Sequence, residues 1–257
     1  MAAERSAVPA ITRAMRIIEL LAEAGQAGAS VADIAATTGI AKSSAALICG
    51  VLEEEKLAGR SDGRYRLGPR FLTLARDYLS TVDRLDEFYA EVRRQPTLAQ
   101  ESARLAILEG TEVIYLARYE AGRPLRLTGQ IGDRFPATVT ATGKALLSTL
   151  SDGVVKDRYR EQVLPRYTER SIQTLPQLLE DLALCRERGY AMDDEETNFG
   201  FVCFAIPVID TPGSPARFSV STTMSKQRAD EVSPGVVVAE LVQVADVFRD
   251  PLVGQSF

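Results

Sequence analysis

The chain has 257 residues, enough for two domains, and its 46% hydrophobic and 25% charged residues are typical of a globular protein. It contains no histidine, which excludes Ser-His-Asp and Cys-His nucleophiles and every histidine-bearing zinc site. Three widely spaced cysteines argue against a disulfide framework, no apolar run approaches the ~20 residues of a membrane span, and residues 1–10 lack a secretory pattern. We therefore expect a cytoplasmic protein without a metal or cofactor, and an enzyme becomes less expected.

The net charge of −5 is unevenly distributed. Residues 1–75 contain nine Lys and Arg against eight Asp and Glu, a net of +1, whereas the rest contains 21 against 27, a net of −6. A near-neutral N-terminal part with clustered arginines on an acidic body indicates that any nucleic-acid contact belongs to the N-terminal part.

Three helices are predicted at the start of the chain. They cover residues 10–25, 30–39 and about 42–56, and Ser30 with Asp33 three residues later is typical of a capping box. Helical spacing predicts a buried face made of Ile11, Met15, Ile18, Leu21 and Ala22 in the first helix and Ala45, Ile48, Val51 and Leu52 in the third.

A basic hairpin is predicted next, at residues 57–67 around Ser61-Asp62-Gly63. Three helices with a tight turn before the third, followed by a hairpin, are the layout of a winged helix-turn-helix, which contacts DNA with its third helix and its wing. The alternative is a small helical dimerisation module with a solvated hairpin. The residues placed to contact bases or phosphates are Lys42, Ser43, Ser44, Arg60, Arg64 and Arg66.

Residues 39–75, GIAKSSAALICGVLEEEKLAGRSDGRYRLGPRFLTLA, resemble the DNA-binding head of IclR-type transcriptional regulators. The resemblance implies that Lys42, Ser43 and Ser44 lie at base- or backbone-contacting positions and that Arg13 lies near a phosphate. The chain departs from the family pattern at Ala46 and Leu47, where a ring or polar residue followed by arginine is common. Without that arginine, the operator cannot be inferred from relatives.

A linker helix at residues 69–79 and an α+β body are predicted after the head. The body combines an antiparallel sheet with flanking helices. Its expected helices cover residues 85–94, a segment from about 142, 174–189 and 234–250. Its expected strands cover 103–110, 111–120, a short stretch within 122–137, 201–210 and 216–224.

Two stretches of the body, GDRFPATVTATGKALL (132–147) and RERGYAMDDEETNFGFVCFAIPVID (186–210), are similar to the GAF-like effector domain of the same family. We therefore divide the chain into a winged helix-turn-helix domain at 1–68, a linker helix at 69–84 and an effector-binding and oligomerisation domain at 85–257.

The Gly-Lys pair of the first stretch invites comparison with a phosphate-binding loop. Thr138 stands where that loop needs its first glycine and Ala145 where it needs a hydroxyl, so the pattern is not a P-loop. A helix starting near Thr142 would instead offer free N–H groups to a carboxylate, and Gly143 would let a ligand approach closely. The alternative is that Thr140 or Thr142 only caps the helix. The candidate ligand-binding residues here are Ala141, Thr142 and Gly143.

The acidic run at 193–196 lacks the spacing of a calcium loop. The family resemblance implies that Asp193 borders the ligand pocket, and we expect the other three acidic residues to be structural or solvent-facing. Strand alternation puts Phe201, Cys203 and Ala205 on one face, and Ser219 and Ser221 likewise. Matching the family motif places Phe201, Cys203, Ser219 and Ser221 on the pocket side. The alternatives are a buried structural thiol and serines that face solvent.

These observations predict a ligand-responsive regulator that binds double-stranded operator DNA, is controlled by a small organic acid and forms a homodimer or homotetramer, with no membrane partner. One alternative is an enzyme with an accessory head that uses Asp193 with Lys144 or Cys203. The other is a constitutive DNA-binding oligomer.

Overall fold

The structure is a computed structural model that describes residues 8–82, 84–121, 129–209, 211 and 213–249. The chain divides into two compact units, Met1–Val82 and Asp83–Phe257, which we call the head and the body. Residues 122–128, the first seven of the stretch expected to hold a further short strand, lie outside the described residues. No single helix in the described part of the chain is long and apolar enough to cross a membrane.

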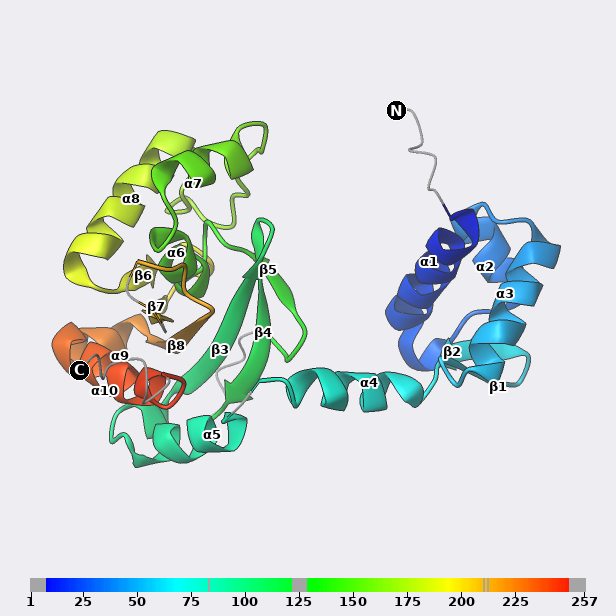
Figure 1. The fold of residues 1–257 in the computed structure, drawn as a ribbon, viewed down its shortest axis with the longest axis horizontal. Helices are drawn as coiled ribbons and strands as arrows, with labels where there is room; N and C mark the ends of the chain where they lie inside the picture. Colours follow the sequence, from blue (N-terminus) through cyan, green and yellow to red (C-terminus); the bar gives the residue numbers. More distant parts are fainter. Residues whose placement is uncertain (1–7, 83, 122–128, 210, 212, 250–257) are drawn as a thin grey trace. The chain divides into compact units, whose positions relative to one another are not determined.

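The head contains three helices, a hairpin and a fourth helix (Figure 1). Ser30 and Asp33 form the expected reciprocal capping box, and Gly39 ends the second helix in the left-handed conformation. Asp62 and Gly63 both have positive φ, as the two-residue hairpin turn requires. The elements are α1 (Pro9–Ala24), the 3₁₀ turn η1 (Gly25–Ala27), α2 (Val31–Thr38), α3 (Lys42–Glu54), β1 (Ala58–Ser61), β2 (Arg64–Leu67) and α4 (Arg70–Leu79).

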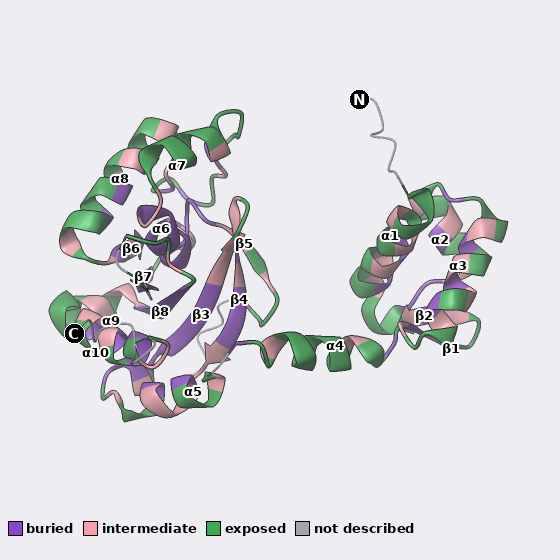
Figure 2. Cartoon of the chain, in the orientation of Figure 1, coloured by how far each residue is buried: buried purple, intermediate pink, exposed green. Residues whose placement is uncertain are grey.

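The predicted buried faces of the head helices are partly wrong. Ile11 and Met15 of α1 are 62% and 48% exposed and Ala22 is exposed as well, because the residues of α1 that pack into the head are Ile17 and Leu21. Along α3, Val51 is exposed and Cys49 is buried in its place. Both helices carry more apolar residues than one face can bury, so periodicity alone does not choose the face. Figure 2 shows the linker helix α4 without any buried residue.

The body is built on one six-stranded antiparallel sheet, in the order β5-β4-β3-β8-β7-β6. Its strands are β3 (Ser102–Glu109), β4 (Glu112–Tyr119), β5 (Arg134–Pro136), β6 (Ala191–Asp194), β7 (Phe201–Val208) and β8 (Phe218–Ser225). Its helices are α5 (Leu85–Arg94), η2 (Leu98–Gln100), α6 (Ala141–Ser148), α7 (Asp152–Tyr159), α8 (Leu175–Arg188), α9 (Lys226–Glu231) and α10 (Pro234–Asp246). The α+β class is therefore confirmed, while β6, α7 and α9 were not predicted.

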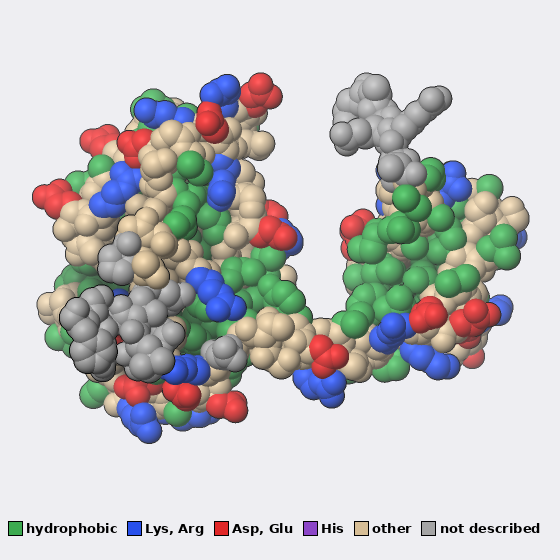
Figure 3. Space-filling view, viewed as in Figure 1, with side chains coloured by type: hydrophobic (Ala, Val, Ile, Leu, Met, Phe, Trp, Pro, Cys, Tyr) green, Lys and Arg blue, Asp and Glu red, His purple; other side chains and the backbone are tan. Residues whose placement is uncertain are grey.

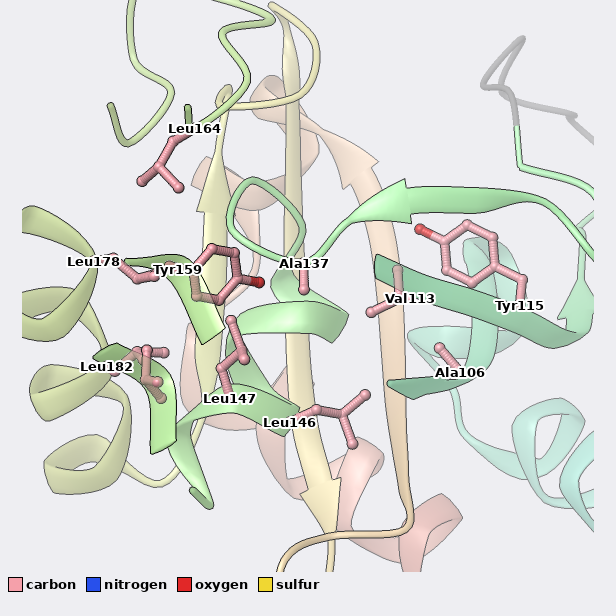
Figure 4. Close-up of a cluster of buried hydrophobic side chains, with 11 residues drawn as sticks. Ala106, Val113, Tyr115, Ala137, Leu146, Leu147, Tyr159, Leu164, Leu178 and Leu182 are labelled. Carbon is pink, nitrogen blue, oxygen red and sulfur yellow. The ribbon is translucent and has the colours of Figure 1, made fainter. Parts of the chain in front are cut away.

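Helices cover both faces of the sheet (Figure 1). On one face, α6 packs on the strands, and α8 packs on both α6 and α7. The leucines of α6 and α8 meet Tyr159 of α7 and Ala106 and Val113 of the sheet in the cluster of Figure 4. On the other face, α10 packs on β7 and β8 and contacts α5. The carboxylate of Glu240 on α10 accepts hydrogen bonds from the backbone N–H groups of Thr97 (3.0 Å) and Leu98 (2.9 Å), so it ties the last helix to the start of the sheet.

Candidate functional site

A small cavity of about 50 Å³ lies in the body between α6 and the sheet. On that measure one water molecule occupies roughly 10–15 Å³, so the space suits a ligand of a few heavy atoms. The cavity walls combine hydroxyl groups, aromatic rings and two oppositely charged side chains. They are Arg104, Tyr115, Phe135, Thr140, Ala141, Thr142, Asp193, Thr197, Asn198, Phe201, Cys203, Ser221 and Thr223.

Two of the predicted ligand-binding residues, Gly143 and Ser219, do not line this cavity. A Cβ at Gly143 would overlap the backbone of Ala137, so this glycine permits a close approach of the chain to itself and not of a ligand. Ser219 is fully buried and its hydroxyl donates to the carbonyl of Thr142 at 3.1 Å. The structure brings the other six together: Ala141, Thr142, Asp193, Phe201, Cys203 and Ser221.

The start of α6 offers fewer free donors than we expected. The side chain of Thr140 accepts a hydrogen bond from the N–H of Gly143 at 3.2 Å, and its carbonyl accepts from the N–H of Lys144 at 3.0 Å. Thr140 therefore caps the helix, as the alternative interpretation of the sequence stated. Thr142 still contributes a polar atom to the cavity: its Oγ1 is buried beside the Tyr115 hydroxyl and makes no hydrogen bond of normal geometry with the described residues.

Arg104 on β3 is the main cavity residue that the sequence analysis missed. It is only 4% exposed, and its Nη1 donates to the hydroxyl groups of Thr223 (3.0 Å) and Ser102 (3.4 Å). Its guanidinium lies 5.4 Å from the centre of the Tyr115 ring, and its buried Nε has no hydrogen-bond partner within the described part of the chain. Among the described residues, no carboxylate forms an ion pair with it. A lone arginine within an apolar strand was the available signal.

Asp193 carries the opposite charge in the cavity and is 2% exposed. Its Oδ1 accepts hydrogen bonds from the N–H groups of Glu196 (2.7 Å) and Thr197 (3.2 Å), and its Oδ2 accepts from the Thr197 hydroxyl. Burial raises the pKa of Asp193 above its usual value, against the effect of these hydrogen bonds. The loop after β6 thus holds the carboxyl in one orientation, with its Oδ2 able to accept another donor.

Lys144 lies outside the cavity wall and is fully buried. Its Nζ forms ion pairs with Glu196 and, at 3.2 Å, with Asp181 on α8. Burial lowers the pKa of Lys144, but the charges of these two carboxylates outweigh that effect and leave it raised. Burial raises the pKa of Glu196 to about 7. Lys144, the lysine of the Gly-Lys pair, therefore balances the charge of carboxylates inside the body.

The remaining acidic residues of the run also have protein partners. Asp194 pairs with Arg170 (3.1 Å) and Lys226, and Glu195 pairs with Arg170 (3.2 Å) and accepts the N–H of Gly200 at 2.8 Å. Glu196 is buried, so it is structural and does not face solvent.

The geometry offers little support for the enzyme alternative. Lys144 is held by two carboxylates away from the cavity. Burial raises the pKa of the Cys203 thiol, which lies 3.2 Å from the hydroxyl of Thr223. A thiol that stays protonated is a poor nucleophile, because the thiolate is the reactive form.

In the head, the predicted DNA-contacting residues of α1 and α3 are accessible. Arg13, Lys42, Ser43 and Arg60 are exposed, and Ser44 is partly buried. The guanidinium of Arg60 lies 5.5 Å from the centre of the Tyr65 ring in the wing. These positions leave the start of α3 open to a partner.

The other two wing arginines have a structural role that was not predicted. Arg64 and Arg66 donate to the backbone carbonyls of residues 26–28 at 2.7–2.9 Å, and Arg64 forms an ion pair with Asp33 at 3.1 Å. They therefore fasten the wing to the turn before α2, and only their remaining N–H groups are available to phosphates.

A winged helix-turn-helix head and a body with a cavity lined by charged, hydroxyl and aromatic side chains define a DNA-binding regulator with a small-molecule domain. Residues 77–247 match the "Bacterial transcriptional regulator IclR C-terminal" family and residues 10–62 match the "IclR helix-turn-helix domain". The chain belongs to the IclR family of transcriptional regulators, whose C-terminal domain binds effectors.

Individual relatives agree with this assignment. The transcriptional repressor AllR of Escherichia coli K12 is 28% identical over 235 residues, which cover 90% of this chain and 86% of AllR. A regulator structure from Rhodococcus sp. RHA1 has a TM-score of 0.78 at 22% identity and covers 94% of this chain and 98% of its own. An IclR homologue from Microbacterium hydrocarbonoxydans, complexed with 4-hydroxybenzoate, has a TM-score of 0.75 at 20% identity. It covers 93% of this chain and 98% of its own.

Proposed function

We propose that this regulator binds operator DNA through its head and that a small organic acid, bound in the cavity of the body, changes that binding. The observation that carries the effector proposal is Arg104, a buried cation that lines the cavity without a carboxylate partner among the described residues. A buried charge is costly unless it is paired, and a ligand carboxylate supplies the missing pair.

The second charge of the cavity restricts the ligand further. Asp193 faces the same space, and a second anionic group beside it would be repelled. A monocarboxylate with a hydroxyl or similar donor at its other end satisfies both residues. The homologue bound to 4-hydroxybenzoate holds a ligand with these two groups, but the cavity of about 50 Å³ favours a smaller one here.

The test compares small hydroxycarboxylates of two to five carbons with their primary amides, which have similar shape and no charge. Calorimetry on the full-length protein should detect at least one acid and none of the matching amides. Arg104→Gln should weaken the binding of that acid by about 10- to 100-fold, because a hydrogen bond to a charged partner contributes roughly 1.5–3 kcal/mol.

Arg118→Gln serves as the control, because Arg118 already pairs with Glu120 outside the cavity. Equal binding of acids and amides, or unchanged affinity in Arg104→Gln, would contradict the proposal. A bound acid should also shift operator affinity, which anisotropy on labelled DNA measures; the coupling expected of such regulators is about 5- to 150-fold.

A further inference from the structure

The outward side of the recognition helix α3 is apolar in its middle, between Ser44 and Glu53. Ala45, Cys49 and Leu52 face the core of the head. On the opposite side, Leu47 is 74% exposed and Val51 is 57% exposed. Between Ser44 and Glu53, the exposed positions of α3 lack a hydrogen-bonding side chain; they are Ala46, Leu47 and Val51.

Helical spacing connects Leu47 to the predicted DNA-contacting end of α3. Leu47 follows Ser43 by four residues, so both side chains lie on one stripe of the helix. In a helix-turn-helix protein the N-terminal part of this helix lies in the major groove, with its residues against the base edges. A side chain on the stripe of Ser43, one turn further along, therefore reaches the bases and not the backbone.

We infer that Leu47 recognises the 5-methyl group of thymine in the operator. This inference rests on the proposed binding of operator DNA. Leucine neither donates nor accepts a hydrogen bond, and the thymine methyl is the apolar group on the major-groove edges of the base pairs. Contact with guanine, adenine or cytosine would instead cover a polar edge with an apolar side chain, which leaves that edge unsatisfied.

The surroundings of Leu47 favour DNA over a protein partner. Lys42 and Ser43 are exposed at the same end of α3, where the free N–H groups of the helix carry partial positive charge. A phosphate backbone complements that charge and places the helix end in the groove.

The experiment begins with selection of sites by the full-length protein from a random double-stranded DNA pool. In the selected site, each thymine is then replaced by deoxyuridine, which removes only the 5-methyl group. We expect one thymine per half-site at which this replacement weakens binding about fourfold, the value of one buried methyl-sized group. Leu47→Ala should weaken binding to the thymine site and be insensitive to that replacement.

Leu47→Arg should change the selected base at the same position to guanine, since arginine pairs with the guanine O6 and N7 acceptors. Leu72→Ala, on the exposed side of α4, is the matched control and should keep the thymine dependence. Because both leucines are exposed, circular dichroism should show unchanged folding in each variant.

Wild-type binding that ignores every deoxyuridine, or a Leu47→Ala variant with the same fourfold dependence, would overturn the inference while leaving operator binding intact. Failure of the wild-type protein to enrich any site would contradict the proposed function, and the inference with it.

Discussion

Arg104 and Asp193 put opposite charges into one small cavity without pairing with each other in an ion pair. Each charge is held by hydroxyl or amide groups: Arg104 by Thr223 and Asp193 by the loop that follows β6. If the proposed organic acid binds here, the site discriminates by orientation, because the ligand must present its anion at one end and its donor at the other. For such a ligand, we expect Asp193 to repel a second carboxylate.

Substitutions of Arg60 and Arg64 should have different effects, because Arg64 is hydrogen-bonded to backbone carbonyls of the head and Arg60 is placed to contact a phosphate. Arg60→Ala should reduce the slope of log affinity against log salt by about one, because one phosphate contact is lost, and change stability by less than ~0.5 kcal/mol. Arg64→Ala should lower the free energy of unfolding by about 1–2 kcal/mol, because it leaves the part-buried carbonyl of Gly28 without this donor and removes the ion pair with Asp33. Urea denaturation measures the change in stability, and anisotropy on labelled DNA across a salt series measures the change in the salt dependence of binding. An Arg64→Ala protein of wild-type stability would contradict the structural role.

At the level of single residues, the sequence predicted which side of a strand faces the cavity but not how far along the strand the cavity lies. Ser219, Ser221 and Thr223 share one face of β8, and only the last two line the cavity. Arg104 reaches the cavity because β3 pairs with β8, which sets Arg104 opposite Ser221. That pairing joins residues more than a hundred positions apart, so local pattern could not reveal it.

At the level of elements, the buried Lys144 links three parts of the body: α6, α8 through Asp181, and the loop after β6 through Glu196.

Elements with their own start and stop residues, such as α8 between Thr174 and Gly189, were predicted at their observed ends. The elements that were missed, β6, α7 and α9, are short and rich in charged residues, and tertiary pairing stabilises them more than their own pattern does.

The buried ion-pair cluster of Lys144, Asp181 and Glu196 predicts that the stability of the body depends on pH. The Glu196 carboxyl, with its pKa raised from 4.5 to about 7, holds a proton in the folded state at pH values where the unfolded chain has lost it. The folded state then binds more protons, so the free energy of unfolding falls as pH rises from about 4.5 to 7. The raised pKa of Asp193 acts in the same direction.

Glu196→Gln should therefore reduce, but not abolish, the loss of stability over this pH range, by an amount on the order of 3 kcal/mol. Urea denaturation at several pH values measures it. Glu161→Gln, at an exposed position, should retain the wild-type pH profile. The same pH slope in Glu196→Gln as in wild type would show that Glu196 does not carry the proton.

At the scale of the whole molecule, the head presents an apolar surface on α1 that nothing in its own fold covers. Figure 3 shows hydrophobic side chains gathered over this helix, and Ile11 and Met15 are exposed on it. Two heads that share a two-fold symmetric operator would bury such a surface against each other.

We expect Ile11→Glu combined with Met15→Glu to weaken self-association of the full-length protein and to lower its operator affinity by at least tenfold, because paired binding is lost. Light scattering after size-exclusion chromatography and anisotropy give the two readouts. Val163→Glu, at a 94% exposed position of the body, should change neither. A doubly substituted protein that binds as tightly as wild type would argue against paired heads.

The hydrogen bonds from Thr97 and Leu98 to Glu240 join positions more than 140 residues apart. The head, in contrast, is held by contacts within its own 82 residues. During synthesis, the head therefore completes its fold while the ribosome is still making the body. The central strands β3 and β8 pair only after residue 225 has emerged, and α10 closes the opposite face last. A nascent regulator thus acquires its DNA-reading surface before the domain that controls it.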